Sequence, residues 1–416
     1  MNILVANNRF FVSGGPERYL FTLIDLLEKN GHSAIPFSNA YRQNNPSPYA
    51  AHFLPPPVDA DAVYYRQFRL APWKKLQLFS RSVYYPEAYR RVAAIIVDRH
   101  IDLAYLLAIA NYISPSIISA CKARRIPVVM RLSDFNLLCP AYLFLREERP
   151  CEECLHHGLQ RAIVHRCLQS SVQVSLARVV AMTLHRLMRV YDQVDAFITP
   201  SRFLMAKMVQ GGFPAERLHY VPSPVKALPA SPEGPGEYIL YFGRITPEKG
   251  LETLLLGFEH LSRQHPAARL LIAGAPTPEL ERLEHILEER QVSNVEFVGF
   301  QEGEQLAMLI DGARFSVCPS IWYENSPMTV YESLAHARPV IVSNLGSLPE
   351  QVEDGTDGLL FEPGNHEQLA DKMAVLWQDP SLASRMGKAG RDRIQRLFSP
   401  EAHYRSLLAV FDQILN

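Results

Sequence analysis

Short apolar runs alternate with longer amphipathic stretches along the chain. Residues 1–6, MNILVA, are apolar and predict a buried strand, and apolar residues recur at helical spacing through 19–27. The same order returns at 238–244, YILYFGR, which is followed by helical spacing through 251–261. Strands that alternate with helices are typical of parallel sheets covered by helices, so the pattern predicts the α/β class.

Length and composition indicate more than one domain. The chain has 416 residues, of which 48% are hydrophobic and 20% are charged, as in ordinary globular proteins. Residues 222–237 are rich in Pro, Ser and Gly and predict a hinge. We therefore expect an N-terminal domain over 1–225, a C-terminal domain over 226–399 and a final helix over 400–416. No secretory signal and no apolar run of about 18 residues is present, so we expect a cytoplasmic location.

Two glutamates, Glu324 and Glu332, flank the heptapeptide NSPMTVY. Asn325, Ser326 and Pro327 predict a helix start, with Ser or Asn as the N-cap and Pro as the first helical residue. Glu324 would lie on the preceding loop, and Glu332 would lie about one and a half turns inside the helix. Carboxylates accept hydrogen bonds from sugar hydroxyls, and a helix N-terminus binds anions. The alternative is an ordinary amphipathic helix with two surface glutamates.

Two cations flank the turn after the predicted strand 238–244. Gly243 and Arg244 end this segment, and Lys249 precedes the next helix. Because a helix N-terminus prefers anions, two cations are unfavourable there unless a diphosphate lies between them. Neither a GxxxxGK[ST] loop nor a GxGxxG fingerprint is present. The alternative is that both cations are solvated loop charges.

The first predicted strand leads into the adjacent glycines Gly14 and Gly15 and then into a helix. A strand, a glycine loop and a helix allow the backbone to approach a phosphate closely. Two adjacent glycines are a weak signal by themselves.

Three stretches, GGPER, GRITPEKG and ENSPMTVYESLAHARPVIVS, occur in this order and resemble the retaining glycosyltransferases of family 4. The likeness extends over the whole chain. It implies the GT-B fold, in which two Rossmann-like domains face each other across a cleft and the final helix completes the N-terminal domain. It also implies transfer of a sugar from a nucleotide diphosphate sugar to an acceptor hydroxyl, with retention at the anomeric carbon and without a catalytic metal.

The resemblance assigns roles to the residues of these motifs. Arg244 and Lys249 would stabilise the leaving diphosphate, Glu324 would bind the donor sugar, and Glu332 would accept hydrogen bonds from the ribose. The implied donor-binding residues are Gly14, Gly15, Gly243, Arg244, Lys249, Glu324, Asn325, Ser326, Pro327 and Glu332.

One position departs from the family pattern. Many relatives have a His-Asp pair where this chain has Ser133 and Asp134. Serine does not titrate near pH 7, which fits a mechanism in which the leaving phosphate takes the acceptor proton. Asp134 is the candidate for orienting the acceptor; a helix cap or loop role is the alternative. A GT-B protein can also be a nucleotide-sugar epimerase, a hydrolase or an inert nucleotide-sugar binder.

The net charge of −1 conceals an asymmetry between the two halves. Residues 1–227 contain 27 Lys and Arg but 16 Asp and Glu, whereas residues 228–416 contain 15 and 27. A basic acceptor domain predicts an anionic saccharide or lipid-linked acceptor, or peripheral contact with the inner face of the plasma membrane. Residues 64–91 interleave aromatics with cations, as at a bilayer interface. Solvated cations over an aromatic core are the alternative, and no nucleic-acid recognition motif is present.

Four of the six cysteines cluster in the sequence: Cys139, Cys151, Cys154 and Cys167. Their spacing and a cytosolic location favour a structural zinc site, with an iron–sulfur cluster as a second possibility. One of His156, His157 and His165 would replace a thiolate in a mixed site. Free cysteines and disulfides are the remaining alternatives. Cys121 and Cys318 lie in apolar segments and are expected to be buried.

Overall fold

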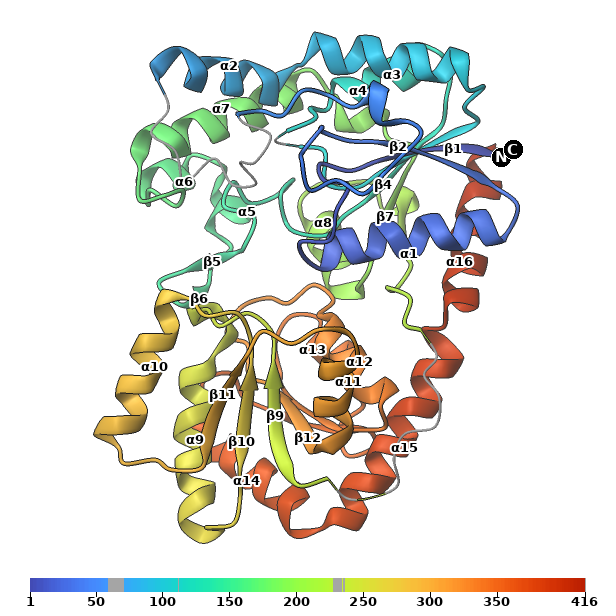
Figure 1. Cartoon of the computed structure of the whole chain (residues 1–416). Helices are drawn as coiled ribbons and strands as arrows, with labels where there is room; N and C mark the ends of the chain where they lie inside the picture. Colours follow the sequence, from blue (N-terminus) through green and yellow to red (C-terminus); the bar gives the residue numbers. More distant parts are fainter. Residues whose placement is uncertain (59–70, 111, 227–233, 235, 416) are drawn as a thin grey trace. The chain divides into compact units, whose positions relative to one another are not determined.

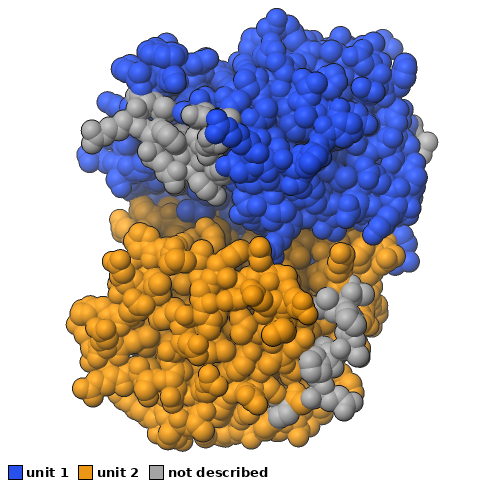
Figure 2. Space-filling view, viewed as in Figure 1, with its two compact units in different colours: residues 1–143, 152–222, 404–416 blue, residues 144–151, 223–403 orange. Residues whose placement is uncertain are grey.

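The computed structural model describes residues 1–58, 71–110, 112–226, 234 and 236–415 (Figure 1). The chain forms two compact units, coloured separately in Figure 2. Unit 1 comprises residues 1–143, 152–222 and 404–416, and unit 2 comprises residues 144–151 and 223–403. The sequence predicts 144–151 within the N-terminal domain, whereas the contacts of this segment group it with unit 2. Part of the predicted hinge, 222–237, lies outside the described residues.

Unit 1 is built on a six-stranded parallel sheet in the order β2-β1-β3-β4-β7-β8. Its strands are β1 (Asn2–Ala6), β2 (Ser33–Phe37), β3 (Leu103–Leu106), β4 (Val128–Arg131), β7 (Ala196–Thr199) and β8 (Leu218–Tyr220). Its helices are α1 (Gly15–Lys29), α2 (Pro72–Val83), α3 (Pro86–Asp98), α4 (Ser116–Lys122), α5 (Glu153–His157), α6 (Arg161–Val164), α7 (Val172–Leu187) and α8 (Arg202–Gln210).

The central strands of unit 1 are apolar without alternation because helices cover both faces of a parallel sheet. Every residue of β3 is buried, and Tyr105 of this strand is among the largest fully buried side chains. The last helix, α16 (Pro400–Leu415), contributes Leu407, Val410 and Phe411 to this core. The C-terminal residues of the chain therefore stabilise the sheet that begins at its N-terminus.

Unit 2 repeats the arrangement, with strand order β11-β10-β9-β12-β13-β14 and all neighbours parallel. Its strands are β9 (Tyr238–Phe242), β10 (Leu270–Ala273), β11 (Val295–Gly299), β12 (Ala313–Cys318), β13 (Val340–Ser343) and β14 (Gly358–Phe361). Its helices are α9 (Leu251–Gln264), α10 (Pro278–Glu289), α11 (Gly303–Gly312), α12 (Met328–Ala335), α13 (Leu348–Gln351), α14 (His366–Gln378) and α15 (Pro380–Leu397). A short antiparallel pair, β5 (Leu145–Arg146) and β6 (Arg149–Pro150), is added by the segment 144–151.

Strand order places a switch point in each sheet. In unit 2 the chain passes from β9 outward to β10 and β11 and then returns to β12 on the other side of β9. In unit 1 it passes from β1 to β2 and then returns to β3. Open α/β sheets bind ligands beyond the carboxyl ends of the strands at such points. The α/β class predicted from the sequence is confirmed. No helix of the described residues is long and apolar enough to cross a membrane.

Candidate active site

The loops that follow β9 and β12 lie at the switch point of unit 2. Arg244 follows β9 by two residues, and the loop after β12 carries Glu324. The backbone N–H of Ile321 donates to the carbonyl oxygen of Glu248 at 3.1 Å, so the two loops are held together.

A glycine fixes this junction. Gly250 has φ +70°, in the left-handed region, and a Cβ at this position would collide with the carbonyl oxygen of Pro319. Lys249 ends the 3₁₀ turn that precedes this glycine and is therefore directed at the loop after β12.

Three donors bind one carboxylate oxygen of Glu324. This residue is only 4% exposed. Lys249 Nζ lies 2.6 Å from Glu324 Oε1, and Ser320 Oγ lies 2.6 Å from the same atom. Trp322 Nε1 donates to this oxygen at 2.9 Å. Among the described residues no donor reaches the second oxygen, Oε2. One oxygen is anchored by the protein, and the other remains to accept a hydrogen bond from a ligand.

The same contacts keep Glu324 charged. Burial raises the pKa of this carboxyl, but the Lys249 ammonium and the three hydrogen bonds lower it, and the net direction is downward. Glu324 is thus a carboxylate at neutral pH and accepts hydrogen bonds from hydroxyl groups.

Both cations near the start of α9 already have carboxylate partners. Lys249 pairs with Glu324, and Arg244 Nη2 lies 3.3 Å from Glu248 Oε1. The two cations are therefore not unfavourable without a diphosphate, contrary to the expectation from the sequence, because these acidic groups offset their charge. The contact of Arg244 and Lys249 with a diphosphate stays a prediction.

Helix α12 begins one residue later than predicted. Pro327 has ψ 119°, which is extended, so it occupies the N-cap position and Met328 is the first helical residue. No side chain caps the helix; the Ser326 hydroxyl instead lies 3.4 Å from the Ser223 hydroxyl. Glu332 lies on α12, half-buried, and its contact with a ribose stays a prediction.

The motif in the sequence did not reveal the residues that hold Glu324 in place. Ser320 and Trp322 lie four and two residues before it, respectively, and supply two of its three hydrogen bonds. Gly346, with φ +62°, packs against the Glu324 backbone, and Ser347 N donates to Glu324 O at 3.1 Å. In the sequence, only the hydrogen-bonding residues just before the motif could have indicated this support for Glu324. The contact from the loop after β13 depends on the fold and leaves no local pattern.

In unit 1 Gly14 is the N-cap of α1, and Gly15 is the first residue of this helix. The backbone at Gly14 is extended, and a Cβ on Gly15 would meet no atom within 4 Å. The fold therefore requires neither glycine, and the space beside Gly15 is open. Glu17 Oε2 accepts a hydrogen bond from Ser13 Oγ at 3.0 Å, and Arg9 Nη1 donates to Ser13 Oγ at 2.9 Å. Arg9 is a basic residue of this loop that the sequence argument did not identify.

Asp134 follows β4 and is bound to its own loop. Asn136 N donates to Asp134 Oδ1 at 2.9 Å, and Asn136 Nδ2 donates to Oδ2 at 2.6 Å. Burial raises the pKa of Asp134, against the lowering effect of Asn136 and Arg178. This geometry favours the loop role over contact with an acceptor, which stays a prediction. Ser133 is half-buried beside it.

The structure does not assemble the predicted metal ligands. None of the six cysteines forms a disulfide. Within the described part of the chain, no group of three or more His, Cys, Asp or Glu side chains is arranged to hold a metal ion. A zinc or iron–sulfur site is therefore without structural support; its predicted ligands were Cys139, Cys151, Cys154 and Cys167.

Other interactions hold the cysteine segment. Cys154 is buried in an apolar cluster with Leu159, Ala162, Val179 and Met182, and Ile163 and Cys167 pack against this cluster. His165 Nε2 lies 2.8 Å from Glu153 Oε2, and Lys207 Nζ lies 2.8 Å from Glu152 Oε2. Cys121 and Cys318 are buried as predicted, and burial raises their pKa values to about 12 and about 11.

The aromatic and basic stretch 64–91 is divided between core and surface. Its residues up to 70 lie outside the described part. Arg81 is buried and donates to Asn39 Oδ1 at 2.5 Å, so this cation of the stretch belongs to the core. Trp73 and Leu76 of α2, in contrast, are 63% and 66% exposed.

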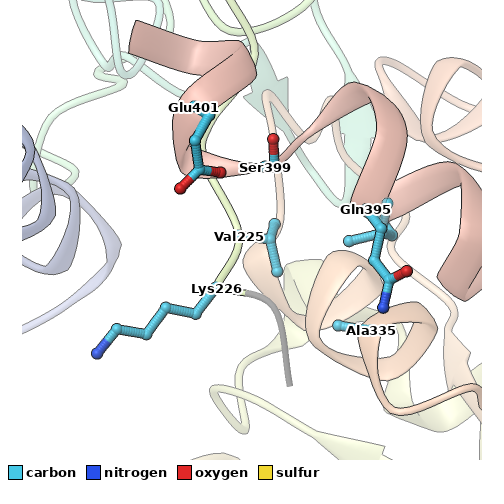
Figure 3. A pocket seen from close by; sticks show the side chains of 7 residues that line it. Val225, Lys226, Ala335, Gln395, Ser399 and Glu401 are labelled. Carbon is cyan, nitrogen blue, oxygen red and sulfur yellow. The ribbon is translucent and has the colours of Figure 1, made fainter. Parts of the chain in front are cut away.

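A hollow of about 240 Å³ in unit 2 lies away from this site (Figure 3). It is lined by Val225, Lys226, Ala335, Ile394, Gln395, Ser399 and Glu401. Ala335 ends α12, an eight-residue helix that rises about 12 Å, whereas Glu324 precedes the start of that helix. We therefore place no catalytic role in this hollow.

Solved structures identify the architecture as GT-B. Sucrose-phosphate synthase from Thermosynechococcus elongatus matches with a TM-score of 0.71 and 20% identity, over 99% of this chain and 98% of that one. HepE from Anabaena, in complex with UDP and glucose, matches with a TM-score of 0.63 and 16% identity, over 99% of both chains. The predicted fold of two Rossmann-like domains is confirmed.

Family models then identify the chain itself. Residues 14–224, half of the chain, match the glycosyl transferase 4-like domain, and residues 229–393 match the glycosyl transferases group 1. The chain belongs to the family-4-like glycosyltransferases, as its motifs indicated.

Curated relatives share part of the sequence. Glycogen synthase of Mycobacterium tuberculosis is 32% identical over 161 residues, which are 39% of this chain and 38% of that protein. The α-D-kanosaminyltransferase of Streptomyces kanamyceticus is 30% identical over 178 residues, 42% of this chain and 44% of that protein. The match thus spans about two fifths of the length of these relatives.

Proposed function

We propose that this chain transfers a sugar from a nucleoside diphosphate sugar to a hydroxyl of a saccharide or lipid-linked acceptor, with retention at the anomeric carbon. The observation that carries the proposal is the Glu324 carboxylate, with Oε1 bound by three donors and Oε2 without a donor among the described residues. It lies at the switch point of a parallel sheet, where such folds bind ligands. Membership of the family sets the class of reaction.

In this proposal the donor binds along the loops after β9 and β12. Glu324 Oε2 accepts a hydrogen bond from a hydroxyl of the donor sugar, and Glu332 accepts hydrogen bonds from the ribose. Among the described residues the N-cap of α12, Pro327, makes no side-chain cap hydrogen bond, so the N–H groups of Met328 and Thr329 can donate to anionic or hydroxyl oxygens of the donor.

The chemical step exchanges one bond at the anomeric carbon for another. The bond from this carbon to the diphosphate oxygen breaks, and its electron pair leaves with the diphosphate. The acceptor oxygen bonds to the same carbon on the same face, and the departing phosphate takes its proton. Arg244 and Lys249 stabilise the negative charge that develops on the diphosphate, without a catalytic metal. Arg244 is suited to this because its side chain is 61% exposed and only its tip contacts Glu248.

Unit 1 supplies the second part of the proposal. The open space beside Gly15 lets a phosphate approach the backbone at the start of α1. The basic character of residues 1–227 supports an anionic acceptor, such as a saccharide or glycolipid of a cell envelope.

Calorimetric titration of the full chain with UDP-, GDP- and ADP-sugars tests this function. We expect one base to be preferred, and we expect Glu332→Ala to weaken binding by about tenfold while Glu367→Ala, an exposed control on α14, leaves it unchanged. Product analysis with and without saccharide acceptors then separates transfer from hydrolysis, and NMR of the product reports retention. Failure to bind every nucleotide sugar would overturn the proposal.

A further inference from the structure

Two stretches of unit 1 contain no acidic residue. Neither 62–86 nor 154–191 includes an Asp or a Glu. Helices α2 (Pro72–Val83) and α7 (Val172–Leu187) lie within these stretches and pack against each other (Figure 1). The buried His185 of α7 contacts the carbonyl oxygen of Val83, at the end of α2, through Nε2 at 3.0 Å. The two helices therefore form one structural element without negative side chains.

Helix α7 exposes an apolar stripe along its length. Val172, Leu176, Val180 and Leu187 are exposed, and their spacing places them on one narrow side of the helix through four turns. Thr183, the remaining residue of this stripe, supplies its only polar group. Helices of globular proteins normally turn such a stripe towards the core. In α7 a different side of the helix faces the core, and the apolar stripe stays exposed.

Helix α2 adds exposed apolar and basic groups. Trp73 and Leu76 are exposed, and Lys74 Nζ lies 5.5 Å from the centre of the Trp73 ring. We call the exposed apolar residues of both helices the docking face: Trp73, Leu76, Val172, Leu176, Val180 and Leu187. Lys75, Arg166 and Arg186 are exposed on or beside these helices, and no acidic side chain of the described residues pairs with them.

We propose that the docking face binds the surface of a bilayer that contains anionic lipids. The apolar side chains enter the boundary between headgroups and acyl chains, and the cations bind the lipid phosphates. A protein partner requires about one hydrogen bond per 100–200 Å² of interface, and the α7 stripe offers a single hydroxyl. The chemistry of the face therefore favours lipid. This proposal is independent of the transferase activity, because it requires no donor.

Vesicle flotation of the full chain tests the proposal. We expect binding to vesicles of phosphatidylcholine with phosphatidylglycerol, weaker binding at higher salt, and none to phosphatidylcholine alone. Leu76→Glu should lower the partition coefficient at least tenfold, and Lys75→Ala should lower it about fivefold. Met308→Glu is the matched control, because Met308 of α11 is 65% exposed, as Leu76 is 66% exposed, and the charge change is the same.

A second measurement does not depend on how well the charged variants fold. Lipids with brominated acyl chains should quench part of the tryptophan fluorescence in the wild type and less of it in Trp73→Phe. The proposal is overturned if anionic vesicles do not bind the chain, if Met308→Glu loses as much binding as Leu76→Glu, or if Trp73→Phe leaves the quenching unchanged. It is also overturned if light scattering shows a dimer that Leu76→Glu dissociates, since the face then joins two copies of the chain.

Discussion

Replacement of Lys249 by methionine tests the charge balance of the candidate active site. The change removes the ammonium group from Glu324 and preserves most of the side-chain volume. The two side chains are 16% and 6% exposed, so water can replace little of the lost interaction. Removal of one partner from a buried ion pair typically costs about 3–5 kcal/mol. Ser320 and Trp322 still donate to Glu324 in the variant. We therefore expect the unfolding free energy to fall by about 3 kcal/mol, the lower end of this range.

The pH dependence of this loss has a defined sign. In the wild type the folded-state pKa of Glu324 is lowered, so its contribution to stability is present above the unfolded pKa of about 4.3 and is lost as the pH falls through the folded pKa. Without Lys249, the raising effect of burial is no longer outweighed by the ammonium charge, so the pKa of Glu324 rises. The variant then loses about 1.4 kcal/mol per pH unit between the unfolded and the raised folded pKa. The difference from the wild type should therefore be larger at pH 7.5 than at pH 5.

Urea unfolding followed by tryptophan fluorescence measures this difference in unit 2. Of the three tryptophans, Trp322 and Trp377 belong to unit 2, so a Trp73→Phe background reports on that unit alone. Lys388→Met, at an exposed position on α15, is the control. An equal loss at pH 5 and pH 7.5, or an equal loss in Lys388→Met, would refute the reasoning.

Two further substitutions test other parts of the structure. Gly15→Ala should change the unfolding free energy by less than about 1 kcal/mol, because a Cβ there meets no atom within 4 Å, yet it should weaken donor binding in calorimetric titration; unchanged affinity would contradict the approach of a phosphate to this loop. Cys151→Ser should leave the thermal midpoint within about 2 °C, because no three or more His, Cys, Asp or Glu side chains of the described residues are arranged to hold a metal ion. One zinc ion per wild-type chain by elemental analysis, lost in this variant, would contradict that expectation.

Local patterns were sufficient for much of the fold. The apolar runs 1–6 and 238–244 are followed by helical spacing, and both became a central strand and its helix. Such patterns predict structure because a strand covered on both faces must be apolar throughout, and an amphipathic helix must repeat its core residues every turn. The limit of this reasoning is visible at Pro327, where an extended ψ moved the helix start by one residue.

Contacts between distant residues were beyond such patterns. Arg81 is a residue type that usually lies at the surface, but the fold surrounds it with hydrogen-bond acceptors. One of them is Asn39, 42 residues away in the sequence. The cysteine spacing fitted a metal site, but Cys154 is packed among apolar side chains. In both cases the residue type was compatible with two environments, and packing selected one of them.

The sequence by itself determined the alternation of strands and helices, the family and the two glutamates of the motif. Only the tertiary structure decided that Lys249 and Glu324, 75 residues apart, form a buried pair on a single carboxylate oxygen. The physical reason is that hydrophobic periodicity is a local property of the chain, whereas an ion pair requires two loops to meet. The parallel order of β9 and β12 brings those loops together at one edge of the sheet.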